Sequence, residues 1–266
     1  TLHKQKRSKC NMIIYDLSKL SPEVRDQILT SDKYTKWFSE FPSKIFNKDN
    51  PKTSKDFKKG ISILVNYGSP AKKSGVNMCA MAHIAQCDTP CLDEAGRGAM
   101  NSVQMSRLRK TLFFNQYREK FMEMFKQEVL THAKYCQKNN LVCAVRPNGT
   151  WDFRWELIAW DFMVEMYNKY GVRWYDYTKI PNRIIPDPKV YDLTFSYSGV
   201  QLYQKFVDTA KALGMRIAVV FRHVEDIPKQ FMGMDVVGGD DGDARFLEPQ
   251  GVICALYAKG KAVHDD

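Results

Sequence analysis

The feature that most constrains the fold is an alternation of strand and helix patterns over residues 141–258. Short runs rich in β-branched and aromatic residues predict strands: LVCAVRPNG, VRWYDYTK, YDLTFSYSG, RIAVVFR and GVICALYAKG. Two intervening segments are typical of helices that end at Gly171 and Gly214. Strands that alternate with helices predict parallel βαβ units whose helices cover a sheet.

The N-terminal part of the chain has a different pattern. Residues 1–40 are predicted to be helical, and Ser21-Pro22-Glu23 has the cap, the first-turn proline and the acidic first turn of a helix start. Residues 41–60 contain Pro, Asn and Lys with little periodicity, which predicts a loop or a connection. We therefore expect a basic, mainly helical N-terminal extension over residues 1–60.

Residues 61–266 are expected to form one α/β domain. ISILVNYG predicts its first strand, and apolar residues spaced by three to five positions from Asn101 to Lys138 predict a long helix. About six strands suit an open, incomplete TIM-barrel-like sheet with covering helices better than a full eightfold barrel. Ligand sites in such sheets lie at the carboxyl ends of the strands. The polar residues expected there, as candidates for binding a substrate or a phosphate, are Arg146, Asn148, Asp176 and Lys179.

The segment that follows the first strand concentrates soft metal ligands. Cys79, His83, Cys87 and Cys91 fall within thirteen residues of a chain that has seven cysteines and five histidines. A continuous helix would separate the first and last of them by roughly 18 Å, whereas sulfurs that share a metal lie about 4 Å apart. Pro90, preceded by the turn residues Asp88-Thr89, predicts a reversal of the chain that brings the three cysteines together.

Two kinds of metal site fit this ligand set. With His83, the set is Cys3His, which is complete for a closed tetrahedral zinc site. With Cys79, Cys87 and Cys91 alone, the set suits a 4Fe–4S cluster with one iron left open. Buried packing is the remaining interpretation, because free cysteine is often buried, and it is the default for Cys10, Cys136, Cys143 and Cys254.

Two other polar segments are candidates for chemistry. GGDDGDARF gathers three aspartates beside Arg245; they could hold Mg²⁺, but a solvated turn with the arginine paired to one aspartate is favoured. GRGAMNSVQMSRLRK carries Arg97, and its Arg107 and Lys110 lie three apart on the predicted helix. This basic segment could grip a phosphate, and a solvent-facing helix start explains it equally well.

The charge of the chain bears on its partners. Residues 1–60 hold 14 Lys and Arg against 7 Asp and Glu, whereas residues 223–266 hold 4 against 9. The basic front could attract nucleic acid, and it equally suits a solvated face because no aromatic-and-basic motif accompanies it. Apolar runs stay well below the roughly 18 residues of a membrane span, and the lysine-rich start lacks a signal peptide's hydrophobic stretch. The sequence therefore predicts a soluble intracellular protein without a membrane partner.

Several long blocks in order resemble the bacteriophage gene 88 protein family. They are CDTPCLDEAGRGAMNSVQMSRLRKTLFF, AVRPNGTWDFRWE, WYDYTK, YDLTFSYS and VVGGDDGDARFLEPQGVICALYAKGKAVHD, within residues 75–266. The family pattern falls on Cys79, Cys87, Cys91, Gly96, Arg97, Arg146, Asn148, Asp152, Asp176, Tyr177, Lys179, Asp240, Asp243, Arg245 and Lys259. Pro147 and Trp151 stand where the pattern has Leu and Ser. The family has no firmly assigned activity, so the resemblance implies a viral origin and the cytoplasm of an infected host cell.

The resemblance also bears on the choice of metal. His83 is not part of the family pattern, which favours an iron–sulfur cluster over Cys3His zinc. We therefore expect a phage metalloprotein whose three cysteines hold a 4Fe–4S cluster at the mouth of the sheet and whose reaction is unknown. Nucleic acid or a small anionic ligand is the expected partner, and the sequence does not identify a substrate. The alternative is a module without catalytic activity, in which zinc or a cluster staples the loop and the basic face binds nucleic acid or a host protein.

Overall fold

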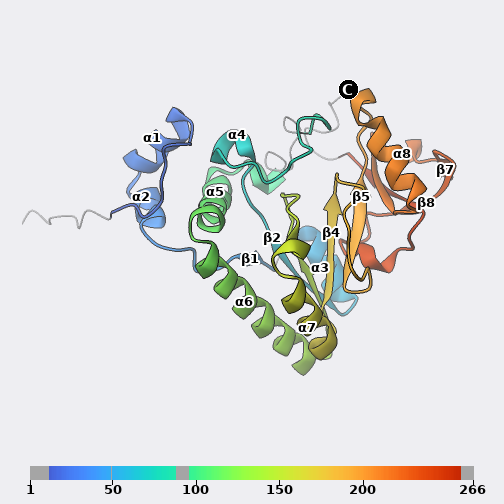
Figure 1. Cartoon of the computed structure of the whole chain (residues 1–266), viewed down its shortest axis with the longest axis horizontal. Coiled ribbons are helices and arrows are strands. Elements are labelled where there is room, and N and C mark those ends of the chain that lie inside the picture. The colour runs from blue at the N-terminus through green and yellow to red at the C-terminus, as the bar shows by residue number, and fades with distance from the viewer. Residues whose placement is uncertain (1–11, 49, 88–95, 259–266) are drawn as a thin grey trace, which may run out of the picture.

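The structure is a computed structural model that describes residues 12–48, 50–87 and 96–258, and the side chains of residues 51, 52, 96 and 97 lie outside this description. In the described part, one sheet has the strand order β1-β2-β3-β4-β5-β6-β9-β8-β7 (Figure 1). The strands are β1 (Phe46–Asn47), β2 (Ile61–Asn66), β3 (Val142–Arg146), β4 (Arg173–Thr178), β5 (Tyr191–Ser196), β6 (Ile217–Phe221), β7 (Gln230–Phe231), β8 (Met234–Gly238) and β9 (Ile253–Tyr257).

The sheet is mostly parallel. Every neighbouring pair from β2 to β8 runs parallel, and the short edge strands β1 and β7 pair antiparallel. This pairing confirms the prediction of an α/β fold built on parallel strands. The described strands form an open sheet with β1 and β7 at its edges, so the expected TIM-barrel-like form is not confirmed.

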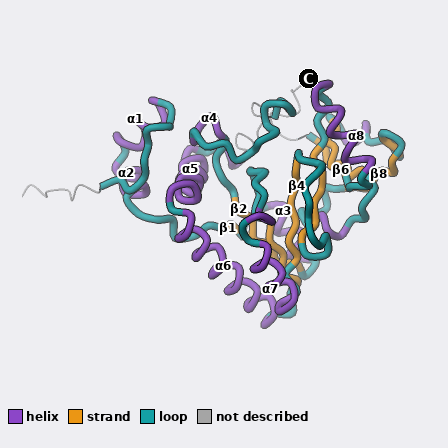
Figure 2. The backbone as a smooth tube through the Cα atoms, in the orientation of Figure 1, coloured by secondary structure: helices purple, strands orange, loops and turns teal. Residues whose placement is uncertain are grey.

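Helices pack along one face of the sheet, where they gather the larger part of the core. Figure 2 shows the strands as one group with α6 and α7 along its flank, and Figure 1 places α8 beside β5, β7 and β8. The helices are α1 (Pro22–Thr30), α2 (Asp32–Phe38), α3 (Pro51–Lys58), α4 (Ala71–Ser74), α5 (Asn101–Gln116), α6 (Arg118–Lys138), α7 (Trp160–Tyr170) and α8 (Gln204–Ala212). Single 3-10 turns at Trp155–Leu157 and Gln201–Tyr203 precede α7 and α8.

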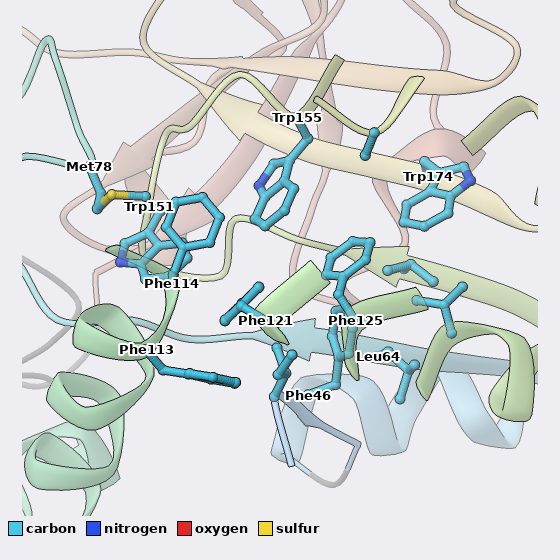
Figure 3. Close-up of a cluster of buried hydrophobic side chains, with 14 of the residues drawn as sticks. Phe46, Leu64, Met78, Phe113, Phe114, Phe121, Phe125, Trp151, Trp155 and Trp174 are labelled. Atoms are coloured by element: carbon cyan, nitrogen blue, oxygen red, sulfur yellow. The ribbon is translucent and has the colours of Figure 1, made fainter. Parts of the chain in front are cut away.

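An aromatic cluster fills the space between β2, β3, β4 and the helices α5, α6 and α7. Phe125 lies at its centre, with its ring 4.9 Å from that of Trp155 and 6.1 Å from that of Trp174. Figure 3 shows Phe121, Phe125, Trp155 and Trp174 among the other buried rings of this cluster. Successive residues of a strand point to opposite faces, so Leu64 of β2 joins this cluster and Ile63 contributes to a smaller core on the second face.

Several helix boundaries follow the expected local chemistry. The Ser21 side chain accepts a hydrogen bond from the Val24 backbone, and Pro22 occupies the first turn of α1. Gly171 and Gly214 both adopt φ 66°, the left-handed conformation that ends α7 and follows α8. These predicted helix ends are confirmed.

One prediction about the first half of the chain is wrong: residues 41–60, expected to be a loop or a connection, contain β1 and α3. The prediction of helical structure over residues 101–138 is confirmed. The helical segment is divided at Tyr117, whose backbone leaves the helical region at φ −132° and ψ 52°. The Tyr117 hydroxyl donates to the Ile14 carbonyl, and its ring packs against Phe41 at 5.0 Å. These contacts come from distant parts of the chain, and they compete with local helix propensity.

The N-terminal helices share the core of the sheet. Ile28 of α1 and Phe38 of α2 are fully buried in the same cluster as Phe113 of α5. Arg109 of α5 donates to the carbonyl oxygens of Glu40 and Phe41 at 2.6 to 3.2 Å. Residues 12–41 therefore pack directly on the α/β core.

Removing the central ring should cost stability. Replacing Phe125, which is fully buried, with Ala is expected to lower the free energy of unfolding by about 3–5 kcal/mol, because buried area is lost and a cavity remains. Leu157→Ala is the matched control, since Leu157 is 70 % exposed and the expected change is below about 0.5 kcal/mol. Urea unfolding measures both. Equal losses in the two variants would contradict the assigned core.

Candidate metal centre at the carboxyl edge of the sheet

The cysteine loop begins after β2 and α4 and lies against the segment that follows β3. Cys79 and Cys87 are half-buried, and the Cys79 thiol donates to the Thr150 carbonyl at 3.7 Å. Residues 79–87 run in hydrogen-bonded turns, and Gln86 adopts φ 49°, so the chain changes direction just before Cys87. Cys91 lies outside the described residues, as do Asp88-Thr89 and Pro90, on which the predicted reversal depends. His83 is exposed on the turns between Cys79 and Cys87.

The backbone just after β2 determines the direction in which the chain enters the cysteine loop. The Gly68 backbone donates to the Thr150 hydroxyl at 2.8 Å, and a side chain at Gly68 would overlap the Trp151 ring at 1.9 Å. Glycine is therefore required where the first parallel strand turns into the cysteine segment. Trp151, which departs from the family pattern, closes this side of the loop.

Lys179 connects the loop to the sheet. It follows β4, and its backbone donates to Asp152 at 2.7 Å. Its ammonium donates to the Ser196 carbonyl and hydroxyl at 3.2 and 3.3 Å and to the Tyr197 carbonyl at 3.2 Å. Burial lowers the pKa of Lys179, and the nearby Cys87 thiol, the Asp152 carboxylate and the Cys79 thiol oppose this shift. The Cys79 and Cys87 thiols, two of the three predicted sulfur ligands, thus both raise the pKa of this ammonium group.

Arg146 occupies the second face of the sheet, at the end of β3. It forms a buried ion pair with Asp243 at 3.0 Å, and its guanidinium lies 4.6 Å from the centre of the Tyr177 ring. Burial opposes the charge, yet Asp243 and the neighbouring tyrosines hold the pKa of Arg146 above its usual value. Its Nε is buried without a hydrogen-bond partner in the described part of the chain. Most of its hydrogen-bonding capacity is therefore used within the protein.

Arg245 is also buried, and its contacts are with other residues of the protein. It lies in a 3-10 turn, Arg245–Leu247, and pairs with Glu248 at 3.2 Å. Its guanidinium donates to the Cys254 sulfur at 2.7 Å. The prediction that GGDDGDARF forms a solvated turn with the arginine paired to one aspartate is wrong. Asp243 is 3 % exposed and pairs with Arg146, which lies 97 residues away, so this partner could not be read from the local pattern.

Asn148 and Asp176 meet in a buried network on the helix-covered face. The Asn148 backbone donates to Asp176 at 2.9 Å, and the Tyr191 hydroxyl donates to its other oxygen at 2.6 Å. Burial raises the pKa of Asp176 to about 7, against the opposing hydrogen bond from Tyr191. Arg183, which carries no sequence signal, pairs with Glu156 beside this network. Asn148 and Asp176 are thus joined to each other, on the opposite face of the sheet from the Arg146–Asp243 pair.

The basic segment after the cysteine loop is only partly exposed to solvent. The Arg97 backbone belongs to a 3-10 turn, Gly96–Ala99, and its side chain lies outside the described part. Lys110 is 3 % exposed and donates to the Ile45 carbonyl at 3.0 Å, so the expected cationic ridge of Arg107 and Lys110 is wrong. Burial lowers the pKa of Lys110 to about 7.

A second group of soft ligands was not predicted as a site. His132, Cys136 and Cys143 are buried, and one ligand atom of each lies within 4.8 Å of the others. The available signal was the spacing of four between the first two on a predicted helix, followed by a cysteine in the next strand. The burial of Cys136 and Cys143 agrees with the prediction that they pack in the core. That prediction did not include the approach of their sulfurs to the His132 side chain.

The raised pKa of Asp176 gives a pH prediction. Between about pH 4 and 7 the carboxyl is ionised in the unfolded chain and protonated in the folded one, so its contribution to stability is lost as pH rises through this window. The stability of the native protein relative to Asp176→Asn should fall by up to about 4 kcal/mol across it. Urea unfolding at several pH values measures the difference, and Asp161→Asn, on an exposed residue, should follow the native curve. Parallel curves for Asp176→Asn and the native protein would contradict the buried neutral carboxyl.

Comparisons with known proteins complete the description of the site. Among the described helices, none is long and apolar enough to cross a membrane. No curated protein and no solved structure matches the chain. A family model described as Gene product 88 matches residues 34–266, which include the cysteine loop and all the strands.

Proposed function

We propose that this chain, which belongs to the Gene product 88 family, binds a 4Fe–4S cluster through Cys79, Cys87 and Cys91 and leaves one iron open. The family match confirms the resemblance to the bacteriophage gene 88 proteins and extends it from residue 75 back to residue 34. The reducing cytoplasm of an infected cell would keep the three thiols available. The reaction itself remains open in this proposal.

The observation that carries the proposal is that the cysteine loop is held by the same two segments that hold Lys179. The Cys79 thiol donates to the Thr150 carbonyl, two residues before the Asp152 carboxylate that accepts from the Lys179 backbone. The Ser198 hydroxyl donates to the Ala85 carbonyl of the loop, next to the Ser196 and Tyr197 carbonyls that accept from the Lys179 ammonium. Cationic groups stabilise thiolates, and the thiolate is the form that binds metal. Three thiolates and a 4Fe–4S core carry a net negative charge, which is costly to bury unless a positive charge lies close by. Lys179 supplies that charge at the carboxyl edge of the sheet, where parallel α/β folds place their ligands.

The residues around the proposed cluster have distinct tasks. Lys179 has three N–H donors, and Ser196 and Tyr197 offer three acceptors for them, so it acts on the centre through its charge. Asp152 accepts from the Lys179 backbone and pairs with Arg183 at 3.3 Å, which holds the lysine in position. When bound, the cluster supplies an iron that can hold a ligand as a Lewis acid or transfer an electron. A small anionic ligand suits the charge that Lys179 brings to this site.

Metal analysis tests the ligand assignment. Protein purified without oxygen is expected to be brown and to contain iron and sulfide, and Cys79→Ser, Cys87→Ser and Cys91→Ser should each lose most of both. Cys254→Ser is the control, because Cys254 belongs to β9 and its sulfur accepts from Arg245, and it should keep the cluster. Colourless protein with one zinc held by the loop would refute the iron assignment and favour a structural staple.

The role of Lys179 has a separate readout. The reduction potential of an iron–sulfur cluster depends on the charge around it. Lys179→Gln is therefore expected to lower the potential by on the order of tens of millivolts, whereas Lys179→Arg, which keeps the charge, should stay near the native value. Electrochemical titration with a spectroscopic readout measures both. Identical reduction potentials in the two variants would show that the charge of Lys179 does not act on the cluster.

A further inference from the structure

The cluster of His132, Cys136 and Cys143 lies at a place distinct from the cysteine loop. His132 and Cys136 belong to α6 and lie four residues apart, so they occupy one stripe of the helix. Cys143 is the second residue of β3, near the amino end of the strand, whereas the cysteine loop follows the carboxyl end of β2. The cluster therefore fills part of the interface between α6 and the sheet.

The spacing of the ligand atoms matches a tetrahedral metal. The Cys136 sulfur lies 3.5 Å from the His132 Nε2, and all three ligand atoms lie within 4.8 Å of one another. Zinc bonds of about 2.3 Å to sulfur and about 2.0 Å to nitrogen at tetrahedral angles put sulfur and nitrogen about 3.5 Å apart. The three side chains already converge at this separation from two elements of the fold.

Burial and charge favour zinc over other ions. The three residues are at most 7 % exposed, so an uncompensated charge there would be costly. Two thiolates neutralise the charge of a divalent ion, and the neutral imidazole completes a ligand set that zinc prefers. A zinc site of this composition is neutral as a whole, which suits the interior of the core.

Ser62 provides an independent indication of a ligand. It pairs with Cys143 across β2 and β3 and is 1 % exposed, yet its hydroxyl has no hydrogen-bond partner in the described part of the chain. The carbonyl of the same residue contacts the His132 Nε2 at 3.2 Å, which places Ser62 beside the cluster. A buried hydroxyl without a partner costs about 1–3 kcal/mol, and a ligand in the cluster would satisfy it.

We propose that His132, Cys136 and Cys143 bind a zinc ion, with the Ser62 hydroxyl at the fourth position. The ion joins α6 to β2 and β3 beneath the core and has no part in the chemistry at the carboxyl edge. In this structure the His132 Nε2 contacts the Ser62 carbonyl at 3.2 Å. A bound zinc ion would take the place of that carbonyl as the partner of Nε2. Neither the iron–sulfur proposal nor its failure affects this site.

The test separates the two centres. A variant with Cys79, Cys87 and Cys91 all replaced by Ser removes the proposed cluster and is expected to retain one zinc per chain. Adding His132→Gln should weaken zinc binding at least tenfold, while the glutamine amide can still donate to the Ser62 carbonyl and preserve the fold. Zinc content after dialysis against a calibrated chelator, with circular dichroism to confirm folding, gives the answer. Folded protein without zinc, or zinc affinity unchanged by His132→Gln, would overturn the proposal.

Cobalt provides a second measurement on the variant with Cys79, Cys87 and Cys91 replaced by Ser, in which the cysteine loop offers no thiols. Cobalt(II) added to this metal-free variant should give the intense visible bands of a tetrahedral site together with sulfur-to-metal charge transfer. Cys254→Ser is expected to leave these bands unchanged, and Ser62→Ala is expected to shift them because the fourth ligand changes. Bands that lack the sulfur charge transfer would exclude the two thiolates as ligands.

Discussion

The buried pair of Arg146 and Asp243 joins parts of the fold that are distant in sequence. Arg146 ends β3, and Asp243 belongs to the segment that follows β8. The Tyr175 hydroxyl of β4 also donates to Asp243 at 2.9 Å, and the Asp243 backbone donates to Asp56 of α3 at 2.6 Å. Removing one partner of such a pair leaves an uncompensated charge that costs about 3–5 kcal/mol. The segment between β8 and β9 is therefore held over the second face of the sheet, where Ala244 and Phe246 pack on Tyr175.

This arrangement explains why the candidate residues divide into separate groups. Arg146 and Arg245 hold the segment after β8, while Asn148 and Asp176 hold the segment after β3 on the opposite face. Lys179 is held by the two segments that also contact the cysteine loop, through Thr150 and Ser198. The carboxyl edge thus combines a polar framework with one cationic group whose pKa the Cys79 and Cys87 thiols raise. Such a framework positions a ligand centre without side chains that must rearrange.

The sequence predicts the helices and strands of this fold better than it predicts the long-range contacts between them. Local signals are sufficient for β2, β3, β4, β5, β6 and β9 and for the helix ends at Gly171 and Gly214, whereas the parallel strand β8 was not predicted. Asn50 and Pro51 offered a helix-start signal for α3 within residues 41–60, but the surrounding lysines and the lack of periodicity obscured it. The break at Tyr117 and the burial of Asp243 depend on contacts with Ile14 and Arg146. Contacts of that separation leave no local pattern in a single sequence.

The order of the strands has a consequence for how the chain assembles. Each strand from β2 to β6 lies beside the one that precedes it, so these strands can pair in turn as synthesis proceeds. β9 then inserts between β6 and β8, although β8 comes first in the chain. Until β9 is in place, β6 presents an unpaired edge with Val219 and Val220, and β8 pairs with β7 but is not joined to the rest of the sheet. β9 therefore protects the edge of β6 from pairing with other molecules, and a polypeptide truncated before β9 would keep that edge exposed.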